Sequence, residues 1–349
     1  MPDRAATLSV VIPGLIPPAG MTAAVLEGLT LPALGRLMAR AERMACSQPA
    51  DTESLLCQSL GIDRQTDWPT APIDLQAEGV PPGSAFWLHA DPVHLRAARH
   101  ELILVDSSAF AVTAAEAAQY VAAFNDHFGA EGYQLVAPDP QRWYLRVPGQ
   151  PVLATRSLHL AAGAAINPAL PQGADALRWH RLFNEIQMLF FDLPVNRQRE
   201  ARGEAPINSV WLWGGGTLPP PVPETRTGVL WGNPRGWRNL ATFAGLETHV
   251  LPDTAPGRLP TQLDWLILDA LHDSARYADY TRWKTALLQL EQHWFAPLIH
   301  HLATGQTRIL DLWSFHEGHG VRWRIHRLDL ARLWRRTPLM HALRPPASV

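Results

Sequence analysis

The sequence predicts an α/β fold in which an open sheet is flanked by helices and a smaller α+β domain is inserted. Two observations indicate this class. Short apolar runs of strand length alternate with segments of helical spacing over most of the 349 residues. Between about 83 and 147 the order changes to strand, strand, helix, strand, strand, which is typical of an α+β module. We therefore expect residues 1–80 and 150–349 to form the core and residues 81–149 the insert.

The individual elements follow from periodicity and from start and stop signals. The β-branched run over 8–12 predicts a buried strand, and the apolar spacing over 31–44 predicts a helix. Thr113 and Glu116 have the spacing of a capping box and begin a predicted helix over 113–128. The same patterns predict helices over 177–191 and 280–301 and strands over 209–213, 248–251, 265–268, 308–313 and 320–325.

Composition narrows the class of protein. Hydrophobic residues make up 47% and charged residues 18%, as in globular domains, and the formal net charge of -2 provides no basic field for nucleic acid. Cys46 and Cys57 are too few to hold the chain by disulfides and form no zinc motif. The sequence shows no membrane-length apolar run and no secretory signal, so we expect a cytoplasmic protein that does not enter a membrane.

Three local motifs have two interpretations each. The glycines over 214–216 follow a predicted strand and would cradle a phosphate or form a tight turn. The histidines over 316–319 lack the HExxH spacing, so a surface turn is favoured over a metal site. A basic, tryptophan-containing segment over 322–336 would bind an acidic partner or nucleic acid, or would be a strand with one face in water.

One stretch resembles a known family. Residues 194–199 read Pro-Val-Asn-Arg-Gln-Arg, and Asn208 and a Trp-Leu-Trp-Gly-Gly-Gly run over 211–216 follow. Their order and spacing are similar to the signature of the archaeal-type, cofactor-independent (2,3-bisphosphoglycerate-independent) phosphoglycerate mutases. The resemblance covers about residues 8–315 and implies an alkaline-phosphatase-like core. The chain also resembles a proteobacterial subgroup described as RpfE-type regulatory proteins.

The chain departs from that family at its catalytic positions. Pro13 stands where the resemblance implies a metal-binding Asp, and Ala50 stands where it implies the nucleophilic Ser. His272 and Arg276 replace an Asp and a His of the late metal-binding segment, and the final adjacent Asp-His pair is absent. Proline offers no ligand atom, alanine cannot carry a phosphoryl group, and a guanidinium cannot bind a cation.

The resemblance and these departures imply a catalytically degenerate, regulatory or binding protein without metal or cofactor. We expect it to recognise a phosphorylated small molecule or a protein partner. The predicted ligand contacts are Asn196, Arg199, Asn208, Trp213, Gly214, Gly216 and Arg276. Arg276 would place positive charge where the family holds a metal ion. The other possibility is that packed side chains fill the former metal site.

The alternative function is an active phosphoglycerate mutase, or another phosphate-handling enzyme, that uses the titratable groups Asp51, Asp269, His272 and Asp273. A third interpretation is a scaffold whose basic C-terminal segment binds another protein or nucleic acid.

Overall fold

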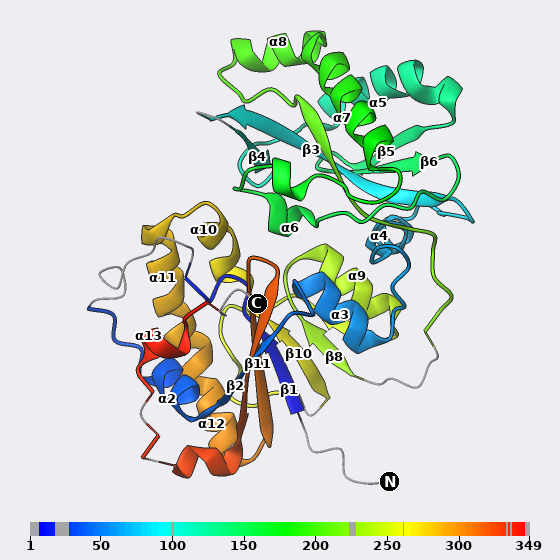
Figure 1. The fold of residues 1–349 in the computed structure, drawn as a ribbon. Coiled ribbons are helices and arrows are strands. Elements are labelled where there is room, and N and C mark those ends of the chain that lie inside the picture. Colours follow the sequence, from blue (N-terminus) through cyan, green and yellow to red (C-terminus); the bar gives the residue numbers. More distant parts are fainter. Residues whose placement is uncertain are drawn as a thin grey trace. The chain divides into compact units, whose positions relative to one another are not determined.

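The computed structural model describes residues 7–17, 28–98, 101–222, 228–260, 262–332, 334–335 and 337–345. The chain divides into two compact units, which we treat separately: unit 1 is Met1–Leu60 with Val222–Val349, and unit 2 is Gly61–Pro221 (Figure 1). The predicted insert, 81–149, falls within unit 2. Unit 2 extends further in both directions, because strand β7 (Ser209–Gly216) pairs with a strand of that unit and the helix over Thr70–Ala77 packs on the same strands.

Unit 1 contains a mixed sheet with the strand order β2-β12-β11-β1-β10-β8-β9. The strands are β1 (Thr7–Val11), β2 (Glu42–Cys46), β8 (Val229–Trp231), β9 (Glu247–His249), β10 (Leu263–Ile267), β11 (Ile309–His316) and β12 (His319–His326). In the centre, Val11 lies opposite both Ile267 and Trp313 in parallel register. β12 is antiparallel to both β11 and β2, so β2 runs in the same direction as β1. The carboxyl ends of the parallel strands therefore meet at one edge.

Helices cover both faces of this sheet (Figure 1). The helical segments are α2 (Pro32–Arg40), α3 (Thr52–Leu60), α9 (Arg235–Phe243), η3 (Asp269–Leu271), α10 (His272–Arg276), α11 (Tyr280–Leu290), the π-helical η4 (Glu291–Phe295), α12 (Ala296–Thr304), η5 (Arg327–Ala331) and α13 (Leu339–Ala342). Helices α2, α11 and α12 lie on one face, and α3 and α9 lie on the other. None of the helices that the structure describes is long and apolar enough to cross a bilayer.

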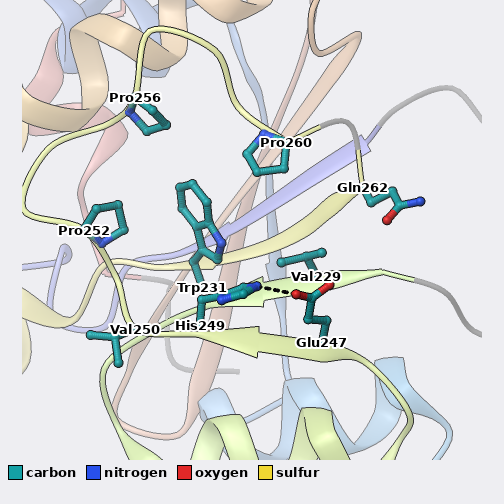
Figure 2. Close-up of a pocket in the computed structure, with 9 residues that line it drawn as sticks. All are labelled: Val229, Trp231, Glu247, His249, Val250, Pro252, Pro256, Pro260 and Gln262. Atoms are coloured by element: carbon teal, nitrogen blue, oxygen red, sulfur yellow. Dashed lines mark ion pairs between the residues drawn. The ribbon is translucent and has the colours of Figure 1, made fainter.

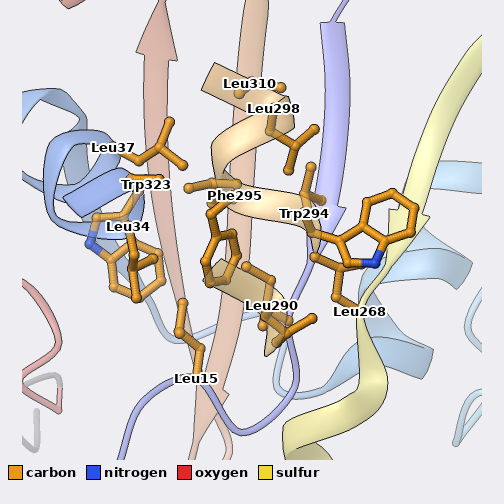
Figure 3. Packing of buried hydrophobic residues seen from close by; sticks show 14 of the residues in the cluster. Leu15, Leu34, Leu37, Leu268, Leu290, Trp294, Phe295, Leu298, Leu310 and Trp323 are labelled. Atoms are coloured by element: carbon orange, nitrogen blue, oxygen red, sulfur yellow. The ribbon is translucent and has the colours of Figure 1, made fainter. Parts of the chain in front are cut away.

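The larger core of unit 1 lies between the sheet and the continuous run of α11, η4 and α12 (Figure 3). Leu290, Trp294 and Phe295 from this run pack near Leu310 and Trp323 of the sheet, and all five are buried. A large apolar side chain that is fully buried contributes about 1.5–3 kcal/mol. The single helix predicted over 280–301 is confirmed, with one π-helical turn inside it.

The N-terminus of helix α2 is capped by a residue that is distant in the sequence. Its own N-cap residue, Leu31, makes no side-chain cap. Instead, the buried Glu291 carboxylate accepts the backbone N–H groups of Ala33, at 2.5 Å, and Leu34, at 3.0 Å. These N–H groups would otherwise have no partner, and the negative charge complements the helix dipole. Glu291 thus joins α2 to the α11–α12 layer.

Unit 2 is built on an antiparallel sheet in which the long strand β3 is central. The strands are β3 (Phe86–Ala97), β4 (Leu102–Asp106), β5 (Gln134–Asp139), β6 (Arg142–Val147) and β7. The helical segments are α4 (Thr70–Ala77), α5 (Ala114–Phe128), η1 (Gly129–Glu131), α6 (Leu158–Ala161), η2 (Asn167–Ala169), α7 (Ala176–Phe191) and α8 (Pro194–Ala201). Side chains of α5 and α7 form one core with β3, β5, β6 and β7. The capping box predicted for α5 is confirmed: Thr113 and Glu116 exchange both bonds.

The predicted fold class is confirmed: unit 1 is an open α/β sheet flanked by helices, and unit 2 is an α+β unit. Two local predictions were wrong. The helix predicted over 31–44 ends at Arg40, because Glu42–Cys46 pairs with β12 instead. Gly214 to Gly216 form no loop or turn, because they continue strand β7. The histidines over 316–319 do lie in a hairpin turn, as predicted, with Glu317 and Gly318 at positive φ.

Replacing Glu291 by Ala should destabilise unit 1 by about 2–4 kcal/mol, because two buried backbone N–H groups lose a charged acceptor. Glu291→Gln should cost less, because one side-chain acceptor remains. The measurement is denaturant unfolding, with the exposed neighbour Gln292→Ala as control. Equal stability of Glu291→Ala and the control would contradict the capping role.

Candidate functional site

The catalytic positions implied by the sequence resemblance come together at the carboxyl edge of the unit 1 sheet. Pro13 follows β1, Asp269 follows β10, and Ala50 follows β2, and these three strands run in one direction. The backbone carbonyl of Pro49 packs against Gly320, where an added Cβ would lie 2.8 Å from that oxygen. The segments that the resemblance assigns to the nucleophile and to metal ions therefore follow strands that end at one edge of this sheet.

The segment that contains Ala50 is the start of helix α3. Asp51 accepts the backbone N–H of Ser54 at 2.8 Å, as an N-cap residue does. The Ser54 hydroxyl accepts the N–H groups of Ala50 and Asp51, each at 3.0 Å, and donates to the Asp51 carbonyl at 3.0 Å. Thr52 and Ser54 are only 3% and 1% exposed. The hydroxyls next to Ala50 are thus buried in the helix cap.

A buried indole fills the space between the nucleophile segment and the late metal segment. Trp237 of α9, 1% exposed, donates its Nε1–H to a Glu53 carboxylate oxygen of α3 at 2.7 Å. The same indole meets the His272 ring edge-on, with centroids 5.9 Å apart. Sequence reasoning missed both Trp237 and Glu53. Trp237 follows the end of β8, so the rule that parallel strand ends share an edge could have located it.

Asp269 is a titratable group at this edge whose environment shifts its pKa. Burial raises the pKa of its carboxyl, and the nearby Asp273 carboxylate adds to the shift. Its Oδ1 accepts from Asn233 Nδ2 at 3.1 Å, and Asn233 Oδ1 accepts the N–H of Leu251 at 3.2 Å. Asn233 thus joins Asp269 to the loop after β9, and sequence reasoning also missed this residue.

The loop that contains Pro13 is tightly packed against α10. Gly14 has a φ of +81°, and a Cβ there would lie 2.7 Å from the Leu271 carbonyl oxygen and 2.9 Å from Ala275 Cβ. The Gly14 carbonyl accepts the indole N–H of Trp283 at 2.8 Å. Close packing, rather than space for an ion, characterises this end of β1.

The two metal ions that the family resemblance implies do not fit this edge. Pro13 has no ligand atom, and Arg276 lies 2.7 Å from Asp273 as an ion pair. Arg276 also lies over the Tyr277 ring, 5.7 Å from its centroid. Among the residues that the structure describes, no three His, Cys, Asp or Glu side chains gather closely enough to hold a metal ion. A metal-clamped phosphoryl transfer therefore lacks its donor set here.

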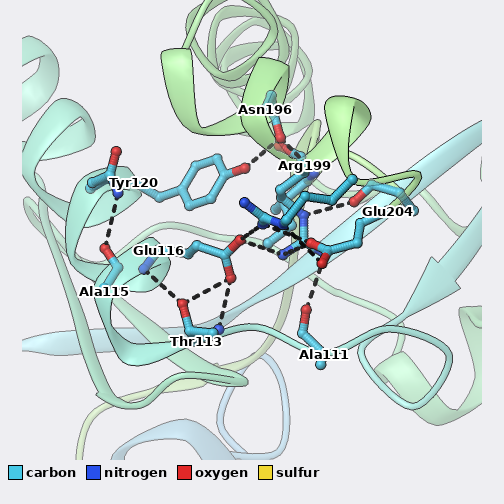
Figure 4. A network of polar contacts seen from close by, with 12 residues as sticks. Ala111, Thr113, Ala115, Glu116, Tyr120, Asn196, Arg199 and Glu204 are labelled. Atoms are coloured by element: carbon cyan, nitrogen blue, oxygen red, sulfur yellow. Dashed lines mark hydrogen bonds and ion pairs between the residues drawn. The ribbon is translucent and has the colours of Figure 1, made fainter.

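Asn196 and Arg199, both predicted as ligand contacts, lie in a buried network of unit 2 (Figure 4). The Asn196 amide group donates to the carbonyls of Phe190 and Ile207, and its oxygen accepts from Tyr120 and from Ile207 N–H. The hydrogen-bonding capacity of this amide is filled by protein groups. The amide joins α5, α8 and the start of β7.

Arg199 is 1% exposed and is also held by protein groups (Figure 4). It donates to the carbonyls of Ala205 and Ala111 and lies 3.0 Å from the Glu116 carboxylate. A buried arginine is stable only with such partners. The ligand-binding role of Asn196 and Arg199 stays a prediction, and their geometry explains them as structural residues.

The other predicted contacts of unit 2 lie along strands. Asn208 bridges to β3: its Oδ1 accepts Leu95 N–H at 2.7 Å and its Nδ2 donates to the Leu95 carbonyl at 3.0 Å. Gly214 is buried in β7 with φ +65°, and a Cβ would overlap Thr70 Oγ1 and approach His89 Cδ2 at 3.0 Å. At Gly216 a Cβ would lie 2.6 Å from Pro69 Cβ. These glycines permit α4 to pack on β7.

Trp213 belongs to a buried polar cluster that sequence reasoning missed. Its indole stacks on the His89 ring, with centroids 4.1 Å apart, and donates to Asp91 at 2.7 Å. Burial raises the pKa of the Asp91 carboxyl. His89 lies 3.4 Å from Asp74, whose carboxylate also pairs with Arg142 at 2.7 Å. The cluster gathers residues from α4, β3, β6 and β7, so local sequence patterns carry no signal for it.

The basic C-terminal segment is partly neutralised within unit 1. Arg322 and Arg324 of β12 both make paired hydrogen bonds to the Asp311 carboxylate of β11. Arg332 pairs with Asp329 at 2.8 Å. Arg335 donates to a backbone carbonyl, and Arg336 lies outside the described residues. The alternation predicted for a strand with one face in water thus agrees with β12.

Comparison with known proteins gives partial similarities to phosphoglycerate mutases. A probable 2,3-bisphosphoglycerate-independent phosphoglycerate mutase of Geobacter sulfurreducens is 30% identical over 152 residues, 43% of this chain and 38% of the relative. The 2,3-bisphosphoglycerate-independent phosphoglycerate mutase of Methanothrix thermoacetophila is 38% identical over 61 residues, 18% of this chain and 16% of the relative. The chain thus spans well under half the length of either curated relative. No protein-family model matches.

Two solved structures align over most of the chain. A Pyrococcus horikoshii protein has a TM-score of 0.49 at 14% identity, covering 92% of this chain and 87% of that one. A cofactor-independent phosphoglycerate mutase from Thermoplasma acidophilum has a TM-score of 0.39 at 12% identity, covering 92% and 90%. The sequence relatives support the similarity to phosphoglycerate mutases.

Gly214→Ala should destabilise unit 2 by about 3 kcal/mol or more, because the new methyl group overlaps Thr70 and the backbone is left-handed. Gly203→Ala is the matched control: Gly203 has φ +74° but no atom within 4 Å of an added Cβ, so about 1 kcal/mol is expected. Denaturant unfolding measures both. Equal losses would show that backbone strain, and not close packing, explains the glycine.

Asp269→Asn should change how stability depends on pH. Because burial raises the pKa of the folded carboxyl above its usual value, the wild-type carboxyl contributes stability at pH values below the unfolded pKa. The wild type loses this stabilising contribution as the pH rises through the folded pKa. Asp269→Asn does not lose it, because the variant has no carboxyl that titrates at this position. The free energy of unfolding, measured from about pH 4 to pH 8, should therefore fall in the wild type relative to Asp269→Asn. The exposed Asp253→Asn serves as control, and parallel curves for wild type and Asp269→Asn would contradict the assignment.

Proposed function

We propose that this chain is a phosphoglycerate-mutase-like protein that works by binding, without phosphoserine chemistry. The observation that carries the proposal is the start of helix α3, where Ala50 occupies the nucleophile position of the resemblance. The neighbouring hydroxyls of Thr52 and Ser54 are buried, and Ser54 donates its hydrogen to a backbone carbonyl. This segment therefore offers no accessible hydroxyl that could accept a phosphoryl group and form a phosphoenzyme.

The surroundings of Ala50 support the same proposal. The Trp237 indole occupies the region between α3 and His272, and an ion pair occupies the region of Arg276 and Asp273. Loss of a nucleophile together with several ligands removes both components of two-metal catalysis. We propose that the ligand is a phosphorylated metabolite and that Arg276 is its cationic contact. The alternative binding partner is a protein. A cytoplasmic, RpfE-type regulatory role is part of this proposal.

A second candidate is acid–base chemistry at Asp269. Its raised pKa would keep a fraction of the carboxyl protonated closer to neutral pH, as a general acid requires. His272, at the start of helix α10 directly after η3, would be the second titratable group. This candidate needs a substrate at the same edge and no metal.

The test is a phosphoglycerate mutase assay on protein purified without chelators, with manganese added, and calorimetric titration with 3-phosphoglycerate. We expect no turnover, and we expect Ala50→Ser alone to remain inactive because the ligand positions stay changed. Binding of 3-phosphoglycerate should weaken about tenfold in Arg276→Gln, since a charged hydrogen bond is lost.

The matched control is Arg282→Gln, an exposed arginine on the adjacent helix α11, which should bind as the wild type does. Metal-dependent turnover by the wild type would contradict the proposal. Turnover without metal that is lost in Asp269→Asn would favour the second candidate. Binding that is equal in wild type, Arg276→Gln and Arg282→Gln would remove Arg276 as the anion contact.

A further inference from the structure

A cavity of about 570 Å³ lies beside the edge strand of the unit 1 sheet, and none of its nine described lining residues is among the carboxyl-edge residues discussed above (Figure 2). Strands β8 and β9 form its floor, and the loop after β9 forms its wall. The volume is in the range of small-molecule sites, which is about 300–1,000 Å³. It is therefore large enough for an organic ligand and not only for water.

The lining of the cavity is mostly apolar. Val229 and Trp231 project from β8, and Pro252, Pro256 and Pro260 come from the loop (Figure 2). Proline has no N–H to donate, so the wall formed by these residues offers shape and apolar surface without hydrogen-bond donors. The indole adds a π face, which attracts cations as well as apolar rings.

The charged side chains of the lining determine whether a positively or a negatively charged ligand is preferred. Among the nine lining residues that the structure describes, Glu247 is the acidic one, and none is a lysine or an arginine. Glu247 Oε1 pairs with His249 Nε2 at 2.8 Å (Figure 2). Both side chains are about half exposed or more, at 65% for Glu247 and 49% for His249, so a ligand can reach them. An anion would face the carboxylate, whereas a cation would gain from the carboxylate and the indole together.

We propose that this cavity binds a small organic cation, an amine with an aromatic or aliphatic body. The apolar body would pack against Trp231 and the three prolines, and the ammonium group would lie near Glu247. This inference goes beyond the proposed function, because it concerns a different site and a ligand of opposite charge. Its failure leaves the phosphate-binding proposal unaffected.

The test is ligand-observed NMR titration of the full chain with three probes of similar shape: phenethylamine, phenethyl alcohol and 3-phenylpropanoate. We expect the amine to bind more tightly than the alcohol and the alcohol more tightly than the carboxylate. Glu247→Gln should weaken amine binding about threefold to fivefold and leave the alcohol unchanged. Trp231→Leu should weaken the amine by about fivefold or more, because the cation loses the π face.

The control is Glu42→Gln, an exposed carboxylate on β2 at the opposite edge of the same sheet, which should bind phenethylamine as the wild type does. Because Trp231 is partly buried, Glu247→Gln is the variant that decides the question if Trp231→Leu does not fold. The proposal is wrong if 3-phenylpropanoate binds as tightly as phenethylamine. It is equally wrong if Glu247→Gln binds the amine like the wild type, or if phenethylamine and cyclohexylmethylamine both fail to bind.

Discussion

The hydrogen bond from the Trp237 indole to Glu53 is the contact on which the account of the carboxyl edge depends. A carboxylate that is 5% exposed is costly to bury, and an N–H donor is what makes the position tolerable. The bond joins α9 to α3, and α3 begins beside Ala50. Because the same indole touches His272, one side chain determines how the nucleophile segment and the late metal segment pack. The indole thus fills part of this edge, where Ala50, Asp269 and His272 keep intermediate exposure.

The family-like signature over 194–216 has a structural explanation inside unit 2. Asn196 and Arg199 donate to backbone carbonyls of the segment between α8 and β7, and the glycines of β7 give room to α4. Residues of this kind specify how a sheet and its helices fit together. A match to such residues transfers architecture more readily than it transfers chemistry.

Features that depend on neighbouring residues could be predicted from the sequence, and features that depend on distant pairing could not. The capping box of Thr113 and Glu116 spans three residues and was confirmed. The end of α2 depends on β12, which lies almost 300 residues away, so the helix predicted to Met44 was too long. For the same reason β7 was assigned to the core sheet, whereas it pairs with β3 of the other unit. Asn208, Gly214 and Gly216, predicted as ligand contacts, lie with β7 in unit 2, so distant pairing also decides where these residues lie.

The measurement that tests the central claim most directly is intact-protein mass spectrometry after incubation with 2-phosphoglycerate and 3-phosphoglycerate, with manganese present. If the chain works by binding, no covalent phosphoryl group will appear on the protein, because the segment after β2 presents alanine in place of a nucleophile. A phosphorylated protein, with the group mapped by peptide analysis to residues 50–54, would contradict the account. It would show that a buried hydroxyl or the Asp51 carboxylate becomes accessible and reacts.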